Sequence, residues 1–259
     1  MNMQGRLVLV TGAGSGIGKA AALRLARAGA DVALLSRTKE ELDEVAEEIE
    51  QMGRTALVVV ADTSSEAQMQ KAFDKVASEF GRLDFVFANA GINGTWAPLD
   101  ELSYEDWNKT MSINLGGTFL TVHLALPLMT EIGGSILITS SINGTRTFTT
   151  AGASAYATTK AGQVAFAQMA ALELAKYRVR VNVICPGAIE SEIDDNTDRD
   201  NVEKARVPAE YPEGTVPLTR GKPGTAEDVA ELVLFLASDA SRHISGTPVW
   251  IDGAQSLLV

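Results

Sequence analysis

Cysteine is nearly absent from this 259-residue chain, which has only Cys185. A single thiol excludes an intrachain disulfide and fits a reducing compartment. Basic residues are also few: 22 Lys and Arg against 33 Asp and Glu give a formal charge of -11 and a pI of about 4.7. Because no basic patch stands out, neither nucleic acid nor an anionic membrane surface is an expected partner.

Long apolar runs are missing as well. No stretch approaches the roughly 18 apolar residues that a membrane-spanning helix needs. The opening MNMQGRLVLVTGAG lacks the charged start and long apolar run of a secretory signal. Since 46% of residues are hydrophobic and 21% are charged, the composition is globular. We therefore expect a cytoplasmic protein with one α/β domain over residues 1–259.

A glycine cluster, TGAGSGIG at residues 11–18, follows an expected strand at Arg6–Thr11 and precedes an expected helix at Lys19–Ala28. This strand, turn and helix layout presents free backbone N–H groups to a phosphate. Glycines let the backbone turn tightly and approach a pyrophosphate closely. We expect a dinucleotide to bind here, against Gly12, Ser15, Gly16, Ile17 and Gly18.

The second expected strand, Asp31–Ser36, is followed by Arg37, with no acid before Glu40. In a dinucleotide fold this strand end faces the adenosine ribose, where an acid favours a free 2′-hydroxyl and a guanidinium favours a 2′-phosphate. Ser36 and Arg37 therefore favour NADP(H). NAD(H) stays possible, because Arg37 could instead cap the turn or stack on adenine with either cofactor.

Two further strand ends carry candidate cofactor residues. Asp62 and Thr63 follow the expected strand Arg54–Val60. Asp62 could accept a hydrogen bond from the adenine amino group or cap the next helix, Ser65–Phe80. The fourth strand, Leu83–Ala88, runs into a small turn whose backbone would lie near the cofactor: Asn89, Ala90 and Gly91.

Strands and helices continue to alternate, which predicts a three-layer, doubly wound α/β (Rossmann) fold with about seven parallel strands and helices on both faces. The remaining expected elements are helices at Lys39–Met52, Asp100–Thr130, Ala155–Tyr177 and Thr225–Ala237, and strands at Ser135–Ser141, Val179–Ile184 and Thr247–Ile251. Residues 189–223 break the alternation. A long polar insertion after a strand is expected to form a lid over the substrate.

Tyr156 and Lys160 are four residues apart in GASAYATTK, so on a helix they share one face. A nearby cation lowers the pKa of a phenol from about 10. Such a phenol can give a proton to a carbonyl oxygen or take one from an alcohol. The spacing alone is common, and an ordinary amphipathic helix is the alternative.

Six motifs, in order, resemble those of the short-chain dehydrogenase/reductase family, and the resemblance spans essentially the whole chain. They are Thr11-Gly12 with Gly16 and Gly18, Asn89-Ala90-Gly91, Asn114, Ser141, Tyr156 with Lys160, and Pro186-Gly187. The Ser141 to Tyr156 spacing is two residues longer than is usual in the family. Because side chains alternate along a strand, only one of Ser140 and Ser141 faces a given side, and we expect it to be Ser141.

The resemblance implies a role for each matched position. Tyr156 would be the general acid and base, Lys160 would tune it and bind the nicotinamide ribose, and Ser141 would hold the substrate oxygen. The backbone of Asn114 would support a water that relays protons to Lys160. Cofactor contacts would also come from Pro186, Gly187, the backbone of Ile189 and the hydroxyl of Ser191.

Substrate contacts are expected from Ser141, Tyr156 and the inserted loop. Asn143 or Arg146 in that loop is predicted to contact a polar or anionic part of the substrate, although Arg146 could instead be solvated or pair with acids of the lid. No metal site is expected. The resemblance also implies a homo-oligomer, tetramer or dimer, for which the helical regions Leu115–Met129 and Ala161–Leu174 offer small and apolar surfaces.

The sequence therefore predicts a carbonyl reductase or alcohol dehydrogenase that acts on a small molecule with NAD(P)(H). One rival is a 3-oxoacyl-[acyl-carrier-protein] reductase. Acidic carrier proteins would be repelled by this acidic chain unless a local basic patch formed at Lys204, Arg206, Arg220 and Lys222. The other rival is a non-catalytic NAD(P)-binding regulator, since a fold alone does not establish chemistry. The complete Asn114, Ser141, Tyr156 and Lys160 set argues against it.

Overall fold

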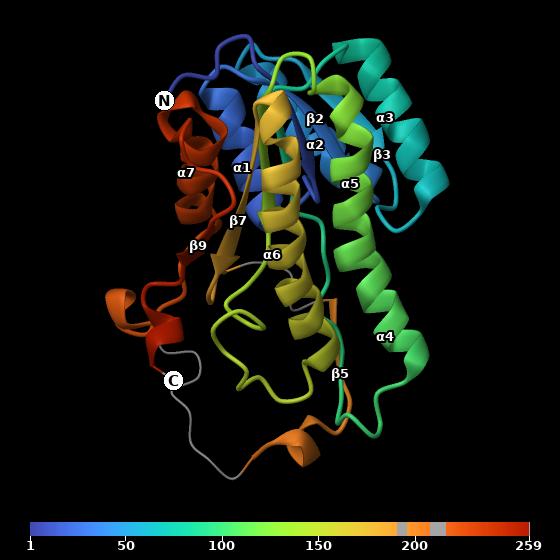
Figure 1. Cartoon of the computed structure of the whole chain (residues 1–259), viewed down its shortest axis with the longest axis vertical. Coiled ribbons are helices and arrows are strands. Elements are labelled where there is room, and N and C mark those ends of the chain that lie inside the picture. Colours follow the sequence, from blue (N-terminus) through green and yellow to red (C-terminus); the bar gives the residue numbers. More distant parts are fainter. Residues whose placement is uncertain (191–195, 208–215, 259) are drawn as a thin grey trace.

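The structure, a computed structural model, describes residues 1–190, 196–207 and 216–258. Its centre is a seven-stranded parallel sheet in the order β3-β2-β1-β4-β6-β7-β9 (Figure 1). These strands are β1 (Leu7–Thr11), β2 (Asp31–Ser36), β3 (Ala56–Val60), β4 (Phe85–Ala88), β6 (Gly134–Thr139), β7 (Val179–Pro186) and β9 (Pro248–Ile251). The predicted fold class is confirmed. The winding reverses between β1 and β4, and such folds bind ligands beyond the carboxyl ends of the strands at that point.

Helices cover both faces of the sheet (Figure 1). One face is covered by α1 (Gly16–Arg27), α2 (Lys39–Gln51) and α7 (Ala226–Ala237), and the other by α3 (Glu66–Phe80), α5 (Gly117–Ala125) and α6 (Ser154–Leu174). Side chains alternate between the faces along each strand. In β1, Val8 and Val10 therefore join the first core and Leu9 joins the second. The near-continuous apolar strands of the sequence follow from this double burial.

The long helical region predicted at Asp100–Thr130 consists of several successive helical elements. It begins at α4 (Tyr104–Met111), where Ser103 Oγ accepts from Asp106 N, rather than at Asp100. A π-helical turn, η1 (Ser112–Gly116), then interrupts it before α5. Such turns occur preferentially at functional sites, and this one carries Asn114.

By length and composition, the helix Tyr104–Leu128 could cross a membrane, with a mean hydropathy of 1.3 over its most apolar window. The expectation that no segment is long and apolar enough to span a membrane was therefore wrong by these two criteria, length and composition. Buried Asn114, Thr118 and Thr121 on this helix form hydrogen bonds inside the protein. A single helix of this kind is weak evidence for a span, because core helices of globular proteins have the same composition.

A second, two-stranded parallel sheet was not predicted. It joins β5 (Gly94–Trp96), which follows the Asn89–Gly91 turn, to β8 (Thr197–Arg199) in the segment predicted to be a lid. Asn93 Nδ2 also donates to Thr197 Oγ1 at 2.8 Å. The described part of the predicted lid thus contains a strand that is paired with the rest of the fold.

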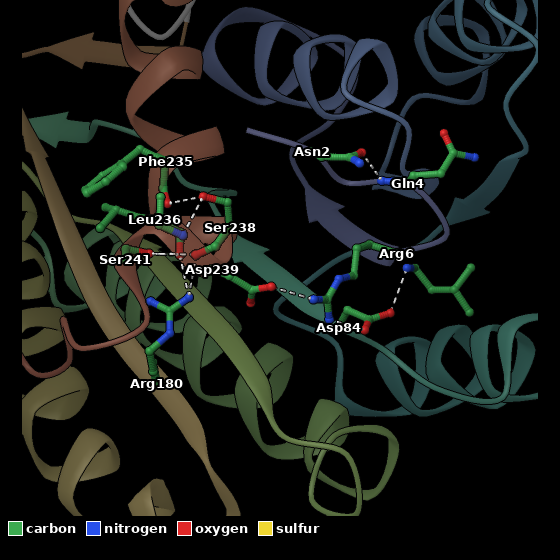
Figure 2. A network of polar contacts seen from close by, with 12 residues as sticks. Asn2, Gln4, Arg6, Asp84, Arg180, Phe235, Leu236, Ser238, Asp239 and Ser241 are labelled. Atoms are coloured by element: carbon green, nitrogen blue, oxygen red, sulfur yellow. Dashed lines mark hydrogen bonds and ion pairs between the residues drawn. The ribbon is translucent and has the colours of Figure 1, made fainter.

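At the amino ends of the strands, away from the carboxyl ends where ligands bind in such folds, a polar network joins several elements (Figure 2). The Arg6 guanidinium donates to Asp84 before β4 and to Asp239 after α7, both at 3.0 Å. Asp84 also accepts from Leu7 N at 2.9 Å. Nearby, Arg180 Nη2 donates to the carbonyl of Leu236 at 3.0 Å. These contacts join a sheet edge that bears none of the candidate site residues.

Candidate active site

The candidate site lies at the carboxyl ends of β1, β4 and β6, which three polar side chains connect. Thr11 Oγ1 accepts from the backbone N–H groups of Asn89 at 3.0 Å and Ala90 at 3.1 Å. Asn89 Oδ1 in turn accepts from Thr139 Oγ1 at 3.0 Å. The Asn89–Gly91 turn is therefore held beside the glycine turn, as its sequence position predicts.

The glycine turn fits a bound pyrophosphate. Gly12 and Gly16 have φ angles of +66° and +49°, in the left-handed region that favours glycine. A Cβ at Gly18 would lie 1.9 Å from the carbonyl oxygen of Gly12, so only glycine allows the helix to pack against the turn. Helix α1 begins here with neither a side-chain cap nor an acidic residue in its first turn. Its first N–H groups remain available to an anion.

Two adjoining cavities extend from this turn. The first, of about 320 Å³, includes Ser36, Arg37, Asp62 and Thr63 in its lining. The second, of about 200 Å³, is lined by Gly16, Ile17, Asn89, Ser141, Tyr156, Lys160, Pro186, Gly187 and Ile189. They share Gly12, Ser15, Ala90, Gly91 and Asn196. Every described candidate cofactor residue lines one of them except Gly18, which packs behind the turn. Ser191 lies outside the described residues.

The Asp62 carboxyl faces its own loop rather than capping a helix. Its Oδ1 accepts from Ser64 N at 2.9 Å and Ser64 Oγ at 2.7 Å. The N-cap residue of α3 is Ser65, so the capping interpretation of Asp62 was wrong. Partial burial raises the pKa of the Asp62 carboxyl, but the bonds from Ser64 and the charge of Arg37 outweigh burial and leave that pKa below its usual value.

Tyr156 and Lys160 lie together on α6, and both are buried, with 7% and 3% of their surface exposed. Lys160 Nζ is 5.3 Å from the centroid of the Tyr156 ring and donates to the carbonyl oxygen of Thr139 at 3.0 Å. Burial lowers the pKa of the Lys160 ammonium to about 8. At neutral pH the ammonium is still charged, and a charge at this position favours the phenolate form of a tyrosine.

The two serines after β6 have different environments. Ser140 Oγ donates to the backbone carbonyl of Lys160 at 2.7 Å and is buried. Ser141 Oγ instead accepts from Asn143 N at 3.1 Å, and among the described residues its proton has no acceptor. Of the two serines, Ser141 is therefore the one whose hydroxyl proton remains available, in the cavity that Tyr156 also lines.

Asn114 is fully buried, and its side chain supports the Asn89–Gly91 turn. Its Oδ1 accepts from Ile92 N at 2.8 Å, and its Nδ2 donates to Ile92 O at 2.9 Å. The backbone carbonyl of Asn114 accepts from Thr118 Oγ1 at 2.7 Å and from Gln163 Nε2 at 3.1 Å. Side chains thus occupy both lone pairs of the carbonyl that the family resemblance assigns to a water.

The inserted loop separates the two predicted substrate residues. The Arg146 guanidinium stacks 3.6 Å from the ring centroid of Trp250 and lines none of the three cavities described. Asn143 lines a third cavity, of about 700 Å³, and its Oδ1 accepts from Thr147 and Thr150. Among the described residues that line this cavity, the charged one is Arg206, from the predicted lid.

Several residues around these cavities were not predicted. Gln255 Oε1 accepts from Ala188 N at 2.7 Å and lies where a Cβ on Gly187 would be, at 2.6 Å. The others are Glu41, Thr139, Gln163 and Asn196. Sequence spacing could have indicated Thr139, two residues before Ser141, and Gln163, three residues after Lys160. The other three reach the site through space from positions outside the motifs.

A doubly wound parallel sheet with a glycine turn and a buried tyrosine–lysine pair at its carboxyl edge defines a nucleotide-dependent oxidoreductase. The family model described as enoyl-(acyl carrier protein) reductase matches residues 12–254. Levodione reductase of Leifsonia aquatica is 37% identical over 255 residues, covering 97% of this chain and 94% of that protein. The 3-oxoacyl-[acyl-carrier-protein] reductase of Thermotoga maritima is 36% identical over 255 residues, covering 98% of both.

Among solved structures, a 3-ketoacyl-ACP reductase from Sinorhizobium meliloti superposes with a TM-score of 0.94 at 54% identity, covering 98% of this chain and 100% of that chain. Structures of other relatives contain NAD or NADP. The chain belongs to the short-chain dehydrogenase/reductase family. It is an oxidoreductase that interconverts carbonyl and CH–OH groups with NAD(P).

Proposed function

We propose that this enzyme interconverts a ketone or aldehyde and its alcohol with Tyr156 as general acid and base. The observation that supports this most directly is the buried Lys160 ammonium, 5.3 Å from the Tyr156 ring, in a cavity that adjoins the glycine turn. An ordinary surface helix would leave both side chains exposed to water.

The chain's own groups handle the substrate oxygen and its proton, while the nicotinamide, when bound, supplies or accepts the hydride. The Ser141 hydroxyl donates a hydrogen bond to the carbonyl oxygen of the substrate. Tyr156 gives its proton to that oxygen in reduction and takes it back in oxidation. The Lys160 ammonium, fixed by the Thr139 carbonyl, stabilises the phenolate that remains. Burial strengthens this interaction because little water screens it.

The cofactor residues follow from the two cavities. The free N–H groups at the start of α1 suit the pyrophosphate, and Ser36 and Arg37 suit a 2′-phosphate. Ala188 and Glu190 form backbone hydrogen bonds with Gly224, so the backbone of Ile189 is held at the cavity, where it suits the carboxamide. Ser191 is proposed to add a hydroxyl there. These contacts support NADP(H) with NAD(H) as an alternative.

We assign the third cavity, of about 700 Å³, to the substrate, and its lining favours a small carbonyl compound with an apolar body. Leu99, Phe148 and Val207 contribute apolar surface to the 700 Å³ cavity, and Asn143 connects it to Ser141. Similarity to the Sinorhizobium meliloti protein favours a second candidate, a 3-oxoacyl thioester carried by acyl carrier protein. Of the predicted basic patch, Lys204 is already paired with Glu101 at 2.6 Å.

We further propose a single cytoplasmic domain that forms homo-oligomers, with residues 189–223 as its lid. Helices α5 and α6 lie side by side in Figure 1 and expose large apolar side chains on their outer surfaces. These are Phe119, at 49% exposed, and Met169 and Leu172, at 71% and 79%. Apolar surface of this kind on adjacent helices suits contact between subunits.

The test is oxidation of NADPH and NADH, followed by absorbance, with alicyclic ketones and with 3-oxoacyl thioesters on acyl carrier protein. Tyr156→Phe should lower kcat/KM by about 10²- to 10⁴-fold, the usual contribution of a general acid. Exposed Tyr177 provides the control, since Tyr177→Phe should leave activity unchanged. Cofactor binding without turnover of any compound would instead support a regulator, and full activity of Tyr156→Phe would refute the catalytic assignment.

A further inference from the structure

Glu41 lies in the cavity that the cofactor assignment gives to the adenosine end. It comes from the first turn of α2, and its carboxylate is folded against the glycine turn. A Cβ at Gly14 would lie 2.4 Å from Glu41 Oε2 and 2.9 Å from Glu41 Cβ. The carboxylate therefore lies directly over the Gly14 backbone, and the absence of a side chain at Gly14 makes room for it.

The same cavity contains Arg37, so cationic and anionic groups face one space of about 320 Å³. Its lining holds one guanidinium, from Arg37, and two carboxylates, from Glu41 and Asp62. Asp62 already accepts two hydrogen bonds from Ser64. Among the described residues Glu41 has no ion pair and no side-chain hydrogen bond. Both of its oxygens are thus acceptors in this cavity that remain available to a ligand.

We propose that Glu41 determines cofactor selectivity by opposing Arg37, accepting hydrogen bonds from ribose hydroxyls and repelling a 2′-phosphate. A carboxylate is a strong acceptor for hydroxyl donors. A phosphate monoester carries a charge of about -1.5 to -2 at pH 7 and has no favourable contact with a carboxylate. Arg37 attracts the same phosphate, so the two residues act in opposite directions on NADP(H). On NAD(H), Glu41 acts through hydrogen bonds to the ribose hydroxyls, which the amide oxygen of a glutamine could also accept.

This proposal rests on the assignment of the cavity to NAD(P), and it refines the preference expected from Arg37 alone. The sequence places Glu41 five residues after the strand end, where no motif marks it. A bound adenosine would contact Glu41 because the first turn of α2 packs against the glycine turn at Gly14. The enzyme should consequently discriminate between NADPH and NADH less than its Arg37 suggests.

The experiment is calorimetric measurement of Kd for NADPH and NADH with the apoenzyme, and for the fragments 2′,5′-ADP and 5′-AMP. Glu41→Gln keeps the size and removes the charge. It should tighten NADPH and 2′,5′-ADP by about tenfold, the effect of about 1.4 kcal/mol, and leave NADH and 5′-AMP within about threefold. Glu40→Gln is the matched control, because Glu40 is the neighbouring acid on α2 and does not line the cavity.

An unchanged NADPH-to-NADH ratio of Kd values in Glu41→Gln would overturn the proposal, and so would an equal shift in Glu40→Gln, which would reflect overall charge alone. Glu41→Asp, which retains the charge but withdraws it, should fall between the wild type and Glu41→Gln. Failure of the wild type to bind either nucleotide would refute the cofactor assignment itself. A changed NADPH-to-NADH ratio of Kd values in Glu41→Gln, with turnover that still depends on Tyr156, would support both the role of Glu41 and the proposed function.

Discussion

The side-chain amide of Gln163 donates to the backbone carbonyl of Asn114 at 3.1 Å and to Thr118 Oγ1 at 2.8 Å, joining α6 to the π-helical turn. The other amide atom, Gln163 Oε1, is buried without a partner among the described residues. If the amide group were rotated by 180°, Gln163 Oε1 would face the Asn114 carbonyl oxygen, and two acceptors would repel each other. The Asn114 carbonyl therefore determines the orientation of the Gln163 amide group.

Gln163→Leu should destabilise the enzyme by about 1–2 kcal/mol, because two buried hydrogen bonds are lost while one unpaired oxygen is also removed. Urea unfolding of the apoenzyme measures this change. Gln168 lies exposed on the same helix, so Gln168→Leu should stay within about 0.5 kcal/mol of the wild type. Equal stability of the two variants would show that the Asn114 carbonyl does not depend on Gln163.

Lys160 should reduce stability while it supports catalysis. Its pKa falls from 10.5 to about 8 on folding, so charging the buried ammonium costs roughly 3 kcal/mol below pH 8. Its bond to Thr139 returns about 1 kcal/mol. Lys160→Met should therefore abolish turnover and raise the free energy of unfolding at pH 7 by about 2 kcal/mol.

The pH dependence of that difference follows from the lowered pKa. Below pH 8 the lysine is protonated in both the folded and unfolded states, so the penalty is complete. Between pH 8 and 10.5 the unfolded chain binds more protons, and wild-type stability rises relative to Lys160→Met. Lys71→Met, on the exposed surface of α3, is the control for removal of a lysine that is not buried. A difference that stays constant across this range would contradict the burial of a charged lysine.

Ser140 and Ser141 should respond differently to the same substitution. Ser140→Ala removes a buried bond to the Lys160 carbonyl and should destabilise the protein by about 1 kcal/mol with a small change in kcat. Ser141→Ala removes the free donor beside Tyr156 and should lower kcat/KM by about 10²-fold with little change in stability. Each variant is the control for the other, measured by steady-state kinetics and urea unfolding. The reverse pattern would assign the substrate contact to Ser140.

The positions of most strands and helices, and with them the three-layer fold class, were predictable because their signals are local and repeated. Doubly buried strands such as Leu7–Thr11 and Phe85–Ala88 are short apolar runs, and helices such as Lys39–Gln51 and Glu66–Phe80 have a regular apolar period. The glycine turn and the tyrosine–lysine pair are equally local. In both features the residues lie a fixed number of positions apart in the chain, so they can be recognised in a single sequence.

What escaped prediction depends on contacts between distant segments. β5 and β8 are three residues each, too short to show a period, and their pairing joins residues about 100 apart. Glu41 over Gly14 and Arg146 on Trp250 are likewise known only from coordinates. The π-helical turn at Asn114 ends at the Gly116–Gly117 pair, but two glycines alone do not show that an α-helix changes to a π-helix.

The lid should be held down by Glu101, which accepts from Asn201 Nδ2 at 2.8 Å and from Lys204 Nζ at 2.6 Å. These contacts extend the β5–β8 pairing, so Glu101→Ala should loosen the segment 196–207. We expect limited proteolysis of this segment to become a few-fold faster, and KM for substrate to rise more than kcat falls. Because surface ion pairs are screened when the Debye length falls to about 3 Å, 1 M salt should bring the wild type towards the variant. Glu105→Ala, on exposed α4, should leave cleavage unchanged. If Glu101→Ala is cleaved no faster than this control, the strand pairing alone holds the lid.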